Sequence, residues 1–182
     1  KKQLSKLNYF IPLSNSIGNE KPLVIDSIQT VIVKDNIDNR TYYYQKFCSY
    51  LLNRNQHIGR IKKRNEGIIL SVENIVFDKE ELYFVIQIEN NSTFDYDLNF
   101  LNLSVETRQK GKKKSLQSLH QEPIYKHHFP SKIAEGKMIR FVYVLSKFSL
   151  SNDRRAILKL NENDGERNIE LKISHKYINN PN

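Results

Sequence analysis

Residues 82–89 read Leu-Tyr-Phe-Val-Ile-Gln-Ile-Glu, and apolar side chains recur there at every second position. One face of this stretch carries Leu82, Phe84, Ile86 and Ile88, and the other carries Tyr83, Val85, Gln87 and Glu89. This alternation is typical of an antiparallel strand, because successive side chains of a strand point to opposite sides of the sheet. The stretch therefore predicts a half-buried β-strand.

Further short strands are predicted on both sides of it, between Gly67 and Ile173. They cover residues 68–77, 100–108, a short stretch around Leu116, 137–145, 156–160 and 168–173. Polar turns separate them, at residues 78–81, 90–92, 110–114 and 163–165. About seven short strands at this spacing predict a mainly β chain folded as an immunoglobulin-like antiparallel β-sandwich.

One short helix is predicted ahead of the strands, at residues 41–55. Its mostly aromatic face carries Tyr43, Phe47, Tyr50, Leu51 and Arg54, widened by Tyr44, Cys48 and Leu52. We expect this face to pack against the end of the sandwich. The predicted order is an extended N-terminal arm at 1–40, with alternative strands at 23–25 and 28–33, the helix and a basic connector at 41–66, the sandwich at 67–178 and a tail at 179–182.

The charge balance limits the partners that the chain can have. Its 182 residues carry a net charge of +9, which suits nucleic acid, an anionic membrane surface, an acidic protein or solubility alone. No groove-entering motif accompanies the charge, so we do not expect nucleic acid. A single cysteine excludes an intrachain disulfide and a Cys-rich zinc site. No stretch approaches the ~20 apolar residues of a membrane-spanning helix.

The sequence lacks a recognisable catalytic or metal-binding motif. His127 and His128 are adjacent, and adjacent strand residues point to opposite faces, so we expect surface loop histidines although His120 and Glu122 lie nearby. Cys48 lies on the apolar helical face, which predicts a buried, unreactive thiol. We therefore predict a non-enzymatic chain without a catalytic residue, metal, cofactor or small-molecule substrate.

The strongest candidate for partner binding is a group of lysines in one predicted loop. Lys110, Lys112, Lys113 and Lys114 would repel one another and favour an anionic partner. The alternative is a solubilising loop, because exposed lysines also prevent edge-to-edge pairing of sheets. No aromatic residues interleave with these lysines, which argues against a single-stranded nucleic-acid platform.

Several short motifs follow one another along the β region. They are residues 86–92 with 96–101, the basic loop 112–114, Glu-Pro-Ile-Tyr at 122–125, Gly-Lys at 136–137, Lys-Phe at 147–148, and Asp-Gly-Glu-Arg at 164–167 leading into 170–173. In this order and spacing they resemble the TraN family of conjugative transposons from Bacteroides-type bacteria, over roughly residues 60–178.

This resemblance implies a structural subunit of a conjugation machine, similar to the β-rich outer-membrane core subunit of type IV secretion systems. It implies a periplasmic, outer-membrane-associated location, other conjugation proteins as partners, and assembly into a multi-subunit ring. Members of that family carry a separate N-terminal β domain, which we do not find before Asp26. The resemblance therefore implies a member that is truncated or divergent at its N-terminus.

The resemblance also implies structural roles for four residues. Asn91 and Ser92 would fix a turn through side-chain to backbone hydrogen bonds, and Tyr96 and Asp97 would anchor the next strand. The Tyr96 ring is expected to be buried, with its hydroxyl bonded to a partner. The leading hypothesis is thus a conjugation scaffold. The alternative is a stand-alone basic module that binds an acidic ligand, nucleic acid or the envelope surface.

Overall fold

The computed structural model describes residues 25–54, 58, 61–107 and 118–182 of the chain. The chain divides into two compact units, residues 1–40 and residues 41–182. All the strands, and the part of the first helix from residue 41 onward, belong to the second unit. No helix in the described ranges is both long enough and apolar enough to cross a membrane.

Helix α1 (Ile25–Asn53) is longer than the helix predicted at 41–55. Residues 25–40 are helical in backbone, so the prediction of an extended arm with a strand at 28–33 is wrong for this part of the chain. The sequence of α1 contains neither glycine nor proline, and helix propagation therefore meets no strong breaker. Residues 1–24, the remainder of the predicted arm, lie outside the described residues.

Ten strands form within the described residues. They are β1 (Ile61–Asn65), β2 (Ile68–Asp78), β3 (Glu81–Asn90), β4 (Tyr96–Thr107), β5 (Ser118–Gln121), β6 (Tyr125–His127), β7 (Lys132–Ile133), β8 (Met138–Ser146), β9 (Arg154–Glu162) and β10 (Ile169–Ser174), followed by helix α2 (His175–Asn179). The predicted strands at 68–77, 82–89, 137–145, 156–160 and 168–173 are confirmed as β2, β3, β8, β9 and β10. The predicted strand around Leu116 falls outside the described residues.

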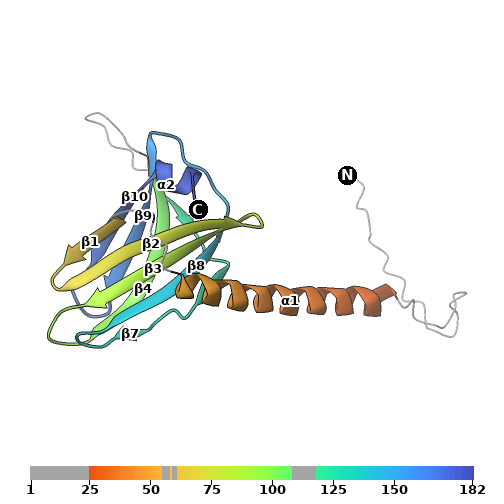
Figure 1. Cartoon of the computed structure of the whole chain (residues 1–182), viewed down its shortest axis with the longest axis horizontal. Helices are drawn as coiled ribbons and strands as arrows, with labels where there is room; N and C mark the ends of the chain where they lie inside the picture. The colour runs from red at the N-terminus through yellow and green to blue at the C-terminus, as the bar shows by residue number, and fades with distance from the viewer. Residues whose placement is uncertain (1–24, 55–57, 59–60, 108–117) are drawn as a thin grey trace, which may run out of the picture. The chain divides into compact units, whose positions relative to one another are not determined.

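The strands form two antiparallel sheets packed face to face (Figure 1). The first sheet has the order β1-β2-β3-β8-β6, and the second has the order β10-β9-β4-β5, with β7 paired to the start of β4. The predicted antiparallel sandwich is therefore confirmed. The described strands outnumber the seven expected because polar segments such as β1 and β6 pair through their backbones without an apolar repeat.

The basic connector predicted after the helix, within residues 41–66, is in part a strand. β1 pairs with β2 from Ile61 to Asn65, across a turn in which Glu66 and Gly67 both have positive φ. Ile61 is buried, whereas Lys62 and the two residues after it stay exposed. One buried anchor and a tight turn are sufficient to place a charged segment at the edge of a sheet.

Two bulges keep the apolar residues of the long strands facing inward. The pairing register of β2 with β3 shifts between Val72 and Asn74, and that of β4 with β9 shifts between Leu98 and Phe100. An extra residue in a strand reverses the side on which the following residues point. The inner face can therefore continue from Val72 to Ile75, although these two residues are three positions apart.

The core between the sheets is built from alternating residues of both. It includes Leu70, Val72, Ile75, Phe84, Ile86, Ile88, Phe141 and Tyr143 from the first sheet, and Leu101, Leu103, Val105, Leu158, Leu160, Leu171 and Ile173 from the second. All of these side chains are buried. The predicted inward face of residues 82–89 is thus confirmed.

A second apolar cluster covers the outer face of the first sheet. Tyr83 and Val85 of β3 and Val142 and Val144 of β8 are buried there against residues of α1. β3 is therefore buried on both faces at this point, and the prediction of a half-buried strand is wrong. The prediction that the helix packs against the end of the sandwich is also wrong, because residues 44–51 of α1 lie on this outer face.

The buried side of α1 is rotated from the predicted stripe by one residue. Among residues 39–53 of α1, Tyr44, Cys48 and Leu51 are buried, while Tyr50 is 51% exposed. Arg140 of β8 donates from Nη1 to the carbonyl oxygen of Leu52 (2.8 Å). This bond satisfies one of the carbonyls that the last turn of a helix leaves without a partner.

The segment after β10 is ordered against the sandwich. Ser174 caps α2, and the backbone N–H of Asn182 donates to Ile75 while the N–H of Phe77 donates to Asn182 (2.9 and 3.2 Å). The segment predicted as a tail at 179–182 thus includes the end of α2 and a contact with the edge of β2.

Candidate functional site

The β3–β4 turn is organised by the side chain of Asn90, which is fully buried. Its Oδ1 accepts from the N–H and the hydroxyl of Ser92 (3.1 and 2.6 Å), and its Nδ2 donates to the carbonyls of Phe94 and Ile133 (2.9 and 3.0 Å). Ser92 makes the predicted side-chain to backbone bond, to the Phe94 carbonyl (3.1 Å). The amide that holds the turn is thus Asn90, whereas Asn91 is exposed.

The β1–β2 turn lies directly against the β3–β4 turn. The backbone N–H of Asn91 donates to the carbonyl of Gly67 (2.9 Å). Gly67 has φ of +83°, and a Cβ built on it would lie 2.9 Å from Cβ of Ser92. Glycine is therefore required at position 67 both by the backbone conformation and by the close approach of the two turns.

Arg167 connects the β9–β10 turn to the same place. Its Nε donates to both oxygens of the Glu162 carboxylate (2.9 and 3.0 Å), its Nη1 donates to the Ser92 hydroxyl (2.7 Å), and its Nη2 donates to the Asp95 carbonyl (2.8 Å). Gly165 leaves the room that this arrangement needs, since a Cβ there would lie 2.2 Å from Oε2 of Glu162. One guanidinium thus joins two turns that are about seventy residues apart in the chain.

Aromatic rings cover the guanidinium. The Cζ of Arg167 lies 4.0 Å from the ring centroid of Phe94 and 5.2 Å from that of Tyr96. Tyr96 is fully buried, and its hydroxyl donates to the Arg167 carbonyl (3.4 Å). The buried ring expected for Tyr96 is present, with a hydroxyl partner that the sequence did not identify. We call Asn90, Ser92, Tyr96, Glu162 and Arg167 the turn network.

The electrostatics of the turn network keep its charged pair ionised. Burial raises the pKa of Glu162, but the hydrogen bonds and the charge of Arg167 outweigh burial and hold it below its usual range. Burial, followed by the negative charge of Glu162, raises the pKa of Tyr96. Glu162 and Arg167 form a buried ion pair with each other. The network is therefore suited to holding turns together rather than to exchanging protons with a substrate.

Asp97 anchors the start of β4 at the rim of the network. Its carbonyl accepts from the N–H of Asn163 (2.8 Å), and its carboxylate lies 3.4 Å from Nζ of Lys132. Lys132 also bonds Asp95 (3.1 Å), and this bond lowers the pKa of the Asp95 carboxyl. These side chains are about half exposed, so the ion pairs contribute little to stability.

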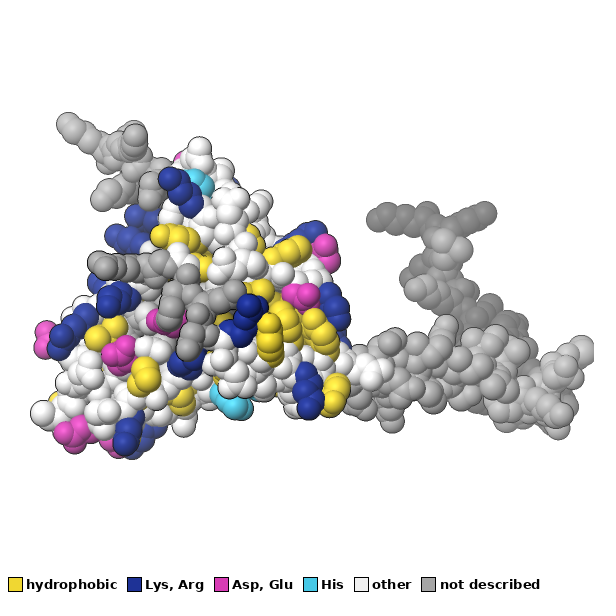
Figure 2. Space-filling view, viewed as in Figure 1, with side chains coloured by type: hydrophobic (Ala, Val, Ile, Leu, Met, Phe, Trp, Pro, Cys, Tyr) yellow, Lys and Arg dark blue, Asp and Glu magenta, His cyan; other side chains and the backbone are white. Residues whose placement is uncertain are grey.

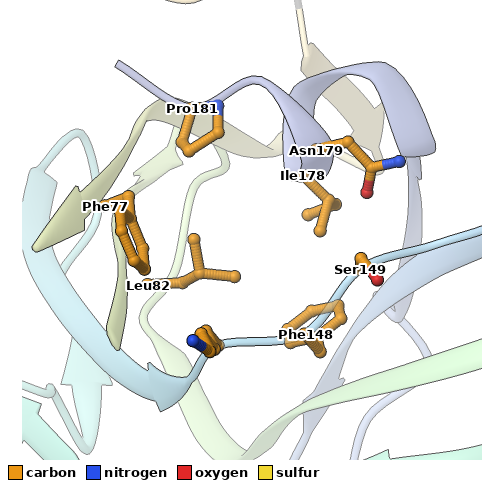
Figure 3. A pocket seen from close by; sticks show the side chains of 8 residues that line it. Phe77, Leu82, Phe148, Ser149, Ile178, Asn179 and Pro181 are labelled. Atoms are coloured by element: carbon orange, nitrogen blue, oxygen red, sulfur yellow. The ribbon is translucent and has the colours of Figure 1, made fainter. Parts of the chain in front are cut away.

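An apolar groove lies elsewhere on the sandwich, beside α2 (Figure 3). It has a volume of about 610 Å³, and its lining residues are Phe77, Leu82, Lys147, Phe148, Ser149, Ile178, Asn179 and Pro181. The side chains of Phe77 and Phe148 stand on opposite sides of the opening. Lys147 is the one charged residue among the described residues of the lining, and it is paired with Glu80. The groove can bury apolar groups, and its described lining brings no acid–base pair together.

A buried carboxylate holds α1 to the first sheet. Glu81 accepts hydrogen bonds from the hydroxyls of Tyr44 (2.5 Å) and Tyr83 (2.8 Å). Burial, with a smaller effect of Glu81, raises the pKa of the neighbouring Cys48 thiol to about 12. The predicted buried cysteine is therefore confirmed.

The two adjacent histidines differ from the prediction. His127 lies on β6 and is buried, and its ring stacks on that of His128 with centroids 4.1 Å apart. The stacking is possible because His128 has φ of +55°, which turns it out of the strand alternation. Burial and then the charge of His128 lower the pKa of His127. Among the described residues no group of three or more His, Cys, Asp or Glu side chains could hold a metal ion.

The lysines predicted to bind a partner belong to the segment between β4 and β5. Lys110, Lys112, Lys113 and Lys114 lie outside the described residues. On the face of the molecule in Figure 2, the lysine and arginine side chains of the described part are dispersed among acidic and uncharged ones. The described surface in this view therefore does not favour one binding site for an anion.

The sequence alone did not identify the main residues of the turn network. Asn90 stands directly before Asn91, the residue predicted to fix the turn. Glu162 and Arg167 flank the predicted turn at 163–165. The sequence signal for the Glu162–Arg167 ion pair is two opposite charges five positions apart around a glycine-containing turn. The same pattern is also expected for two separate, solvent-exposed residues.

Comparison with known proteins places the chain in a family. No curated protein and no solved structure matches it. A family model described as Domain of unknown function (DUF4138) matches residues 43–181, which include the C-terminal part of α1, both sheets and α2. Because this match covers well over half of the sequence, the chain belongs to the DUF4138 family.

Proposed function

We propose that this chain is a non-enzymatic structural subunit of a bacterial conjugation apparatus of the type IV secretion kind. In this proposal it assembles with other transfer proteins in the periplasm near the outer membrane, as a member of the TraN family of conjugative transposons does. Its task is to support the passage of DNA by holding neighbouring subunits in place.

One observation carries the proposal. The motif at 86–92 with 96–101 and the motif at 164–167, two of those on which the TraN resemblance rests, are far apart in the sequence, yet residues of both meet in the turn network. Chance similarity of short motifs gives no reason for them to meet in space. Their convergence supports a shared architecture in which these residues have one common role.

The chemistry of the turn network supports a scaffold in particular. Arg167 uses its donors on Glu162, Ser92 and Asp95, so its guanidinium serves to hold the β3–β4 turn and the β9–β10 turn together. A rigid end of a sandwich is useful in a subunit that must keep its shape under load from its neighbours. It offers little to a reaction, which needs a group that is free to bind substrate.

The test is an affinity purification of the tagged chain from envelope extracts of a conjugation-competent cell, at low and high salt. We expect the same transfer proteins to be recovered at both salt concentrations, because an apolar protein interface is insensitive to salt while phosphate contacts are not. A sample with tag alone controls for carry-over. Recovery only of DNA or anionic envelope material, lost at high salt, would favour the basic binding module instead.

A further inference from the structure

The exposed side of α1 carries a regular series of side chains. Tyr42, Lys46, Tyr50 and Arg54 follow at intervals of four residues from α1 into the residue just beyond it, and together they form what we call the tyrosine–cation ridge. Tyr42 is 60% exposed and Tyr50 is 51% exposed, and both cations are exposed. Residues four apart form a ridge on a helix surface, which is the feature that fits into the groove of a second helix.

The ridge is held in place before any partner binds. Nζ of Lys46 lies 5.5 Å from the ring centroid of Tyr42, and Cζ of Arg54 lies 5.3 Å from that of Tyr50. Tyr50 also stacks on Phe47 (6.1 Å), whose ring meets the buried Tyr83 edge-on (4.8 Å). Side chains that are already ordered lose less conformational entropy when they enter an interface.

The sign of the charge around the ridge is positive. Residues 41–54 include Lys46 and Arg54 and contain no aspartate or glutamate. In the described part of the chain, Asp78 and Glu81 contact this segment and both are engaged, since Asp78 accepts from the Tyr43 hydroxyl (2.6 Å) and Glu81 is buried. Nζ of Lys79 adds a further cation 3.4 Å from the ring centroid of Tyr43. Charge complementarity therefore favours a partner that presents negative charge to the ridge.

The side-chain types favour a protein over a lipid or a nucleic acid. Tyrosine and arginine are the residues enriched at the energetic centres of protein interfaces. A helix that inserts into a membrane surface needs exposed aliphatic side chains or tryptophan, and the ridge has neither. Stacking of bases needs open ring faces, whereas Lys46 and Arg54 each lie over a ring.

We infer that the tyrosine–cation ridge is the docking surface for an acidic helix of a partner protein. The partner helix would present Asp or Glu side chains four residues apart, opposite Lys46 and Arg54, with small or apolar residues between them to receive Tyr42 and Tyr50. The inference deepens the proposed function and rests on it, because a scaffold subunit is what needs a protein partner.

Site-specific photo-crosslinking of the full chain tests this inference. The photoreactive residue benzoylphenylalanine replaces Tyr50, and in a control chain it replaces Phe100, an exposed ring on β4. After irradiation in envelope extract, the crosslinked peptide is sequenced by mass spectrometry. We expect a crosslink specific to position 50, to a helical segment with acidic residues at intervals of three or four.

Charge reversal supplies the second readout. Lys46→Glu with Arg54→Glu should reduce the yield of the crosslink from position 50 about tenfold, the scale for losing two exposed ion pairs. The matched control is Lys172→Glu with Lys176→Glu, which changes the net charge equally at exposed positions of β10 and α2. This control should crosslink like the parent, and the melting temperatures of both variants should show that they are folded.

Several results would overturn the inference. They are a crosslink to nucleic acid, a crosslink to a segment without acidic residues, no crosslink beyond that of position 100, and equal loss in both charge-reversed chains. The experiment distinguishes a failure of the ridge inference from a failure of the proposed function. Transfer proteins that co-purify without crosslinking at position 50 would refute the ridge alone, while an acidic helix from a protein unrelated to transfer would refute the conjugation role alone.

Discussion

Arg167 shows how much of this fold depends on single side chains in turns. The residue is 7% exposed, and its guanidinium is bonded to Glu162, Ser92 and the backbone of Asp95. Removing one member of such a pair leaves a buried charge without compensation, whereas replacing both members by apolar residues can be nearly neutral. The two kinds of variant therefore separate the energetic role of the pair from its role in packing.

We predict that Arg167→Met lowers the free energy of unfolding by about 3–5 kcal/mol, because it strands the Glu162 carboxylate. The measurement is urea unfolding followed by circular dichroism. The control is the double variant Arg167→Met/Glu162→Met, which should recover most of the loss. A single variant as stable as the parent would mean that the pair is not buried in solution.

The same pair predicts a dependence of stability on pH. Because the pKa of Glu162 is lower in the folded chain than in the unfolded chain, its contribution is fully present above the unfolded value of about 4.3 and is lost as the pH falls through the folded value. The difference in unfolding free energy between the parent and Arg167→Met/Glu162→Met should therefore shift against the parent below that pH. A difference that stays constant down to acid pH would contradict a lowered pKa.

Tyr96 is predicted to contribute mainly through its buried ring. Tyr96→Ala should lower the free energy of unfolding by ~3 kcal/mol, the scale for truncation of an aromatic core residue. Tyr96→Phe keeps the ring and removes only a long hydrogen bond to the Arg167 carbonyl, so it should cost about 1 kcal/mol or less. Thermal unfolding of the two variants checks the order, and equal losses would show that the hydroxyl dominates.

At the scale of elements, the packing of α1 on the first sheet explains why β3 and β8 are apolar on both faces. Their inner residues fill the sandwich, and Tyr83, Val85, Val142 and Val144 receive the helix. Glu81 links the helix to the sheet, because its carboxylate accepts hydrogen bonds from the hydroxyls of Tyr44 on α1 and Tyr83 on β3. The helix is therefore part of the folded body from residue 44 to residue 51.

The thiol of Cys48 is predicted to report this packing. It is fully buried between α1 and the sheet, and its pKa is raised to about 12. We expect no reaction with a disulfide reagent at mildly alkaline pH in the native chain, and full reaction in urea. Reaction at the rate of a free cysteine without denaturant would show that α1 does not stay on the sheet.

Elements with a regular apolar period could be predicted from the sequence, and elements defined by their neighbours could not. The alternation at 82–89 located β3, but the bulges in β2 and β4 interrupt the period, and β1 is charged at three of its five positions. The aromatic face of α1 indicated burial without indicating against what, because periodicity carries no information about the partner surface. The sequence signal for a helix on the outer face of the first sheet is the apolar outer residues of β3 and β8.

At the scale of the whole molecule, the candidate site is a product of topology. Asn90 and Ser92 lie at the end of β3, while Glu162 and Arg167 lie in the β9–β10 turn of the other sheet. No spacing rule relates positions 92 and 167, so the site became visible only when the two sheets were placed face to face. The segment that matches the DUF4138 family model, residues 43–181, contains all the residues of this network.

The most direct test of the proposed conjugation role is the transfer frequency of a mobile element from donor cells that lack this chain. We predict that transfer falls to the background of the assay and returns with the parent chain on a plasmid. Nicking of the DNA at the origin of transfer should stay normal, because a structural subunit acts after the DNA is processed. Transfer at the parental frequency in cells without the chain would contradict the account.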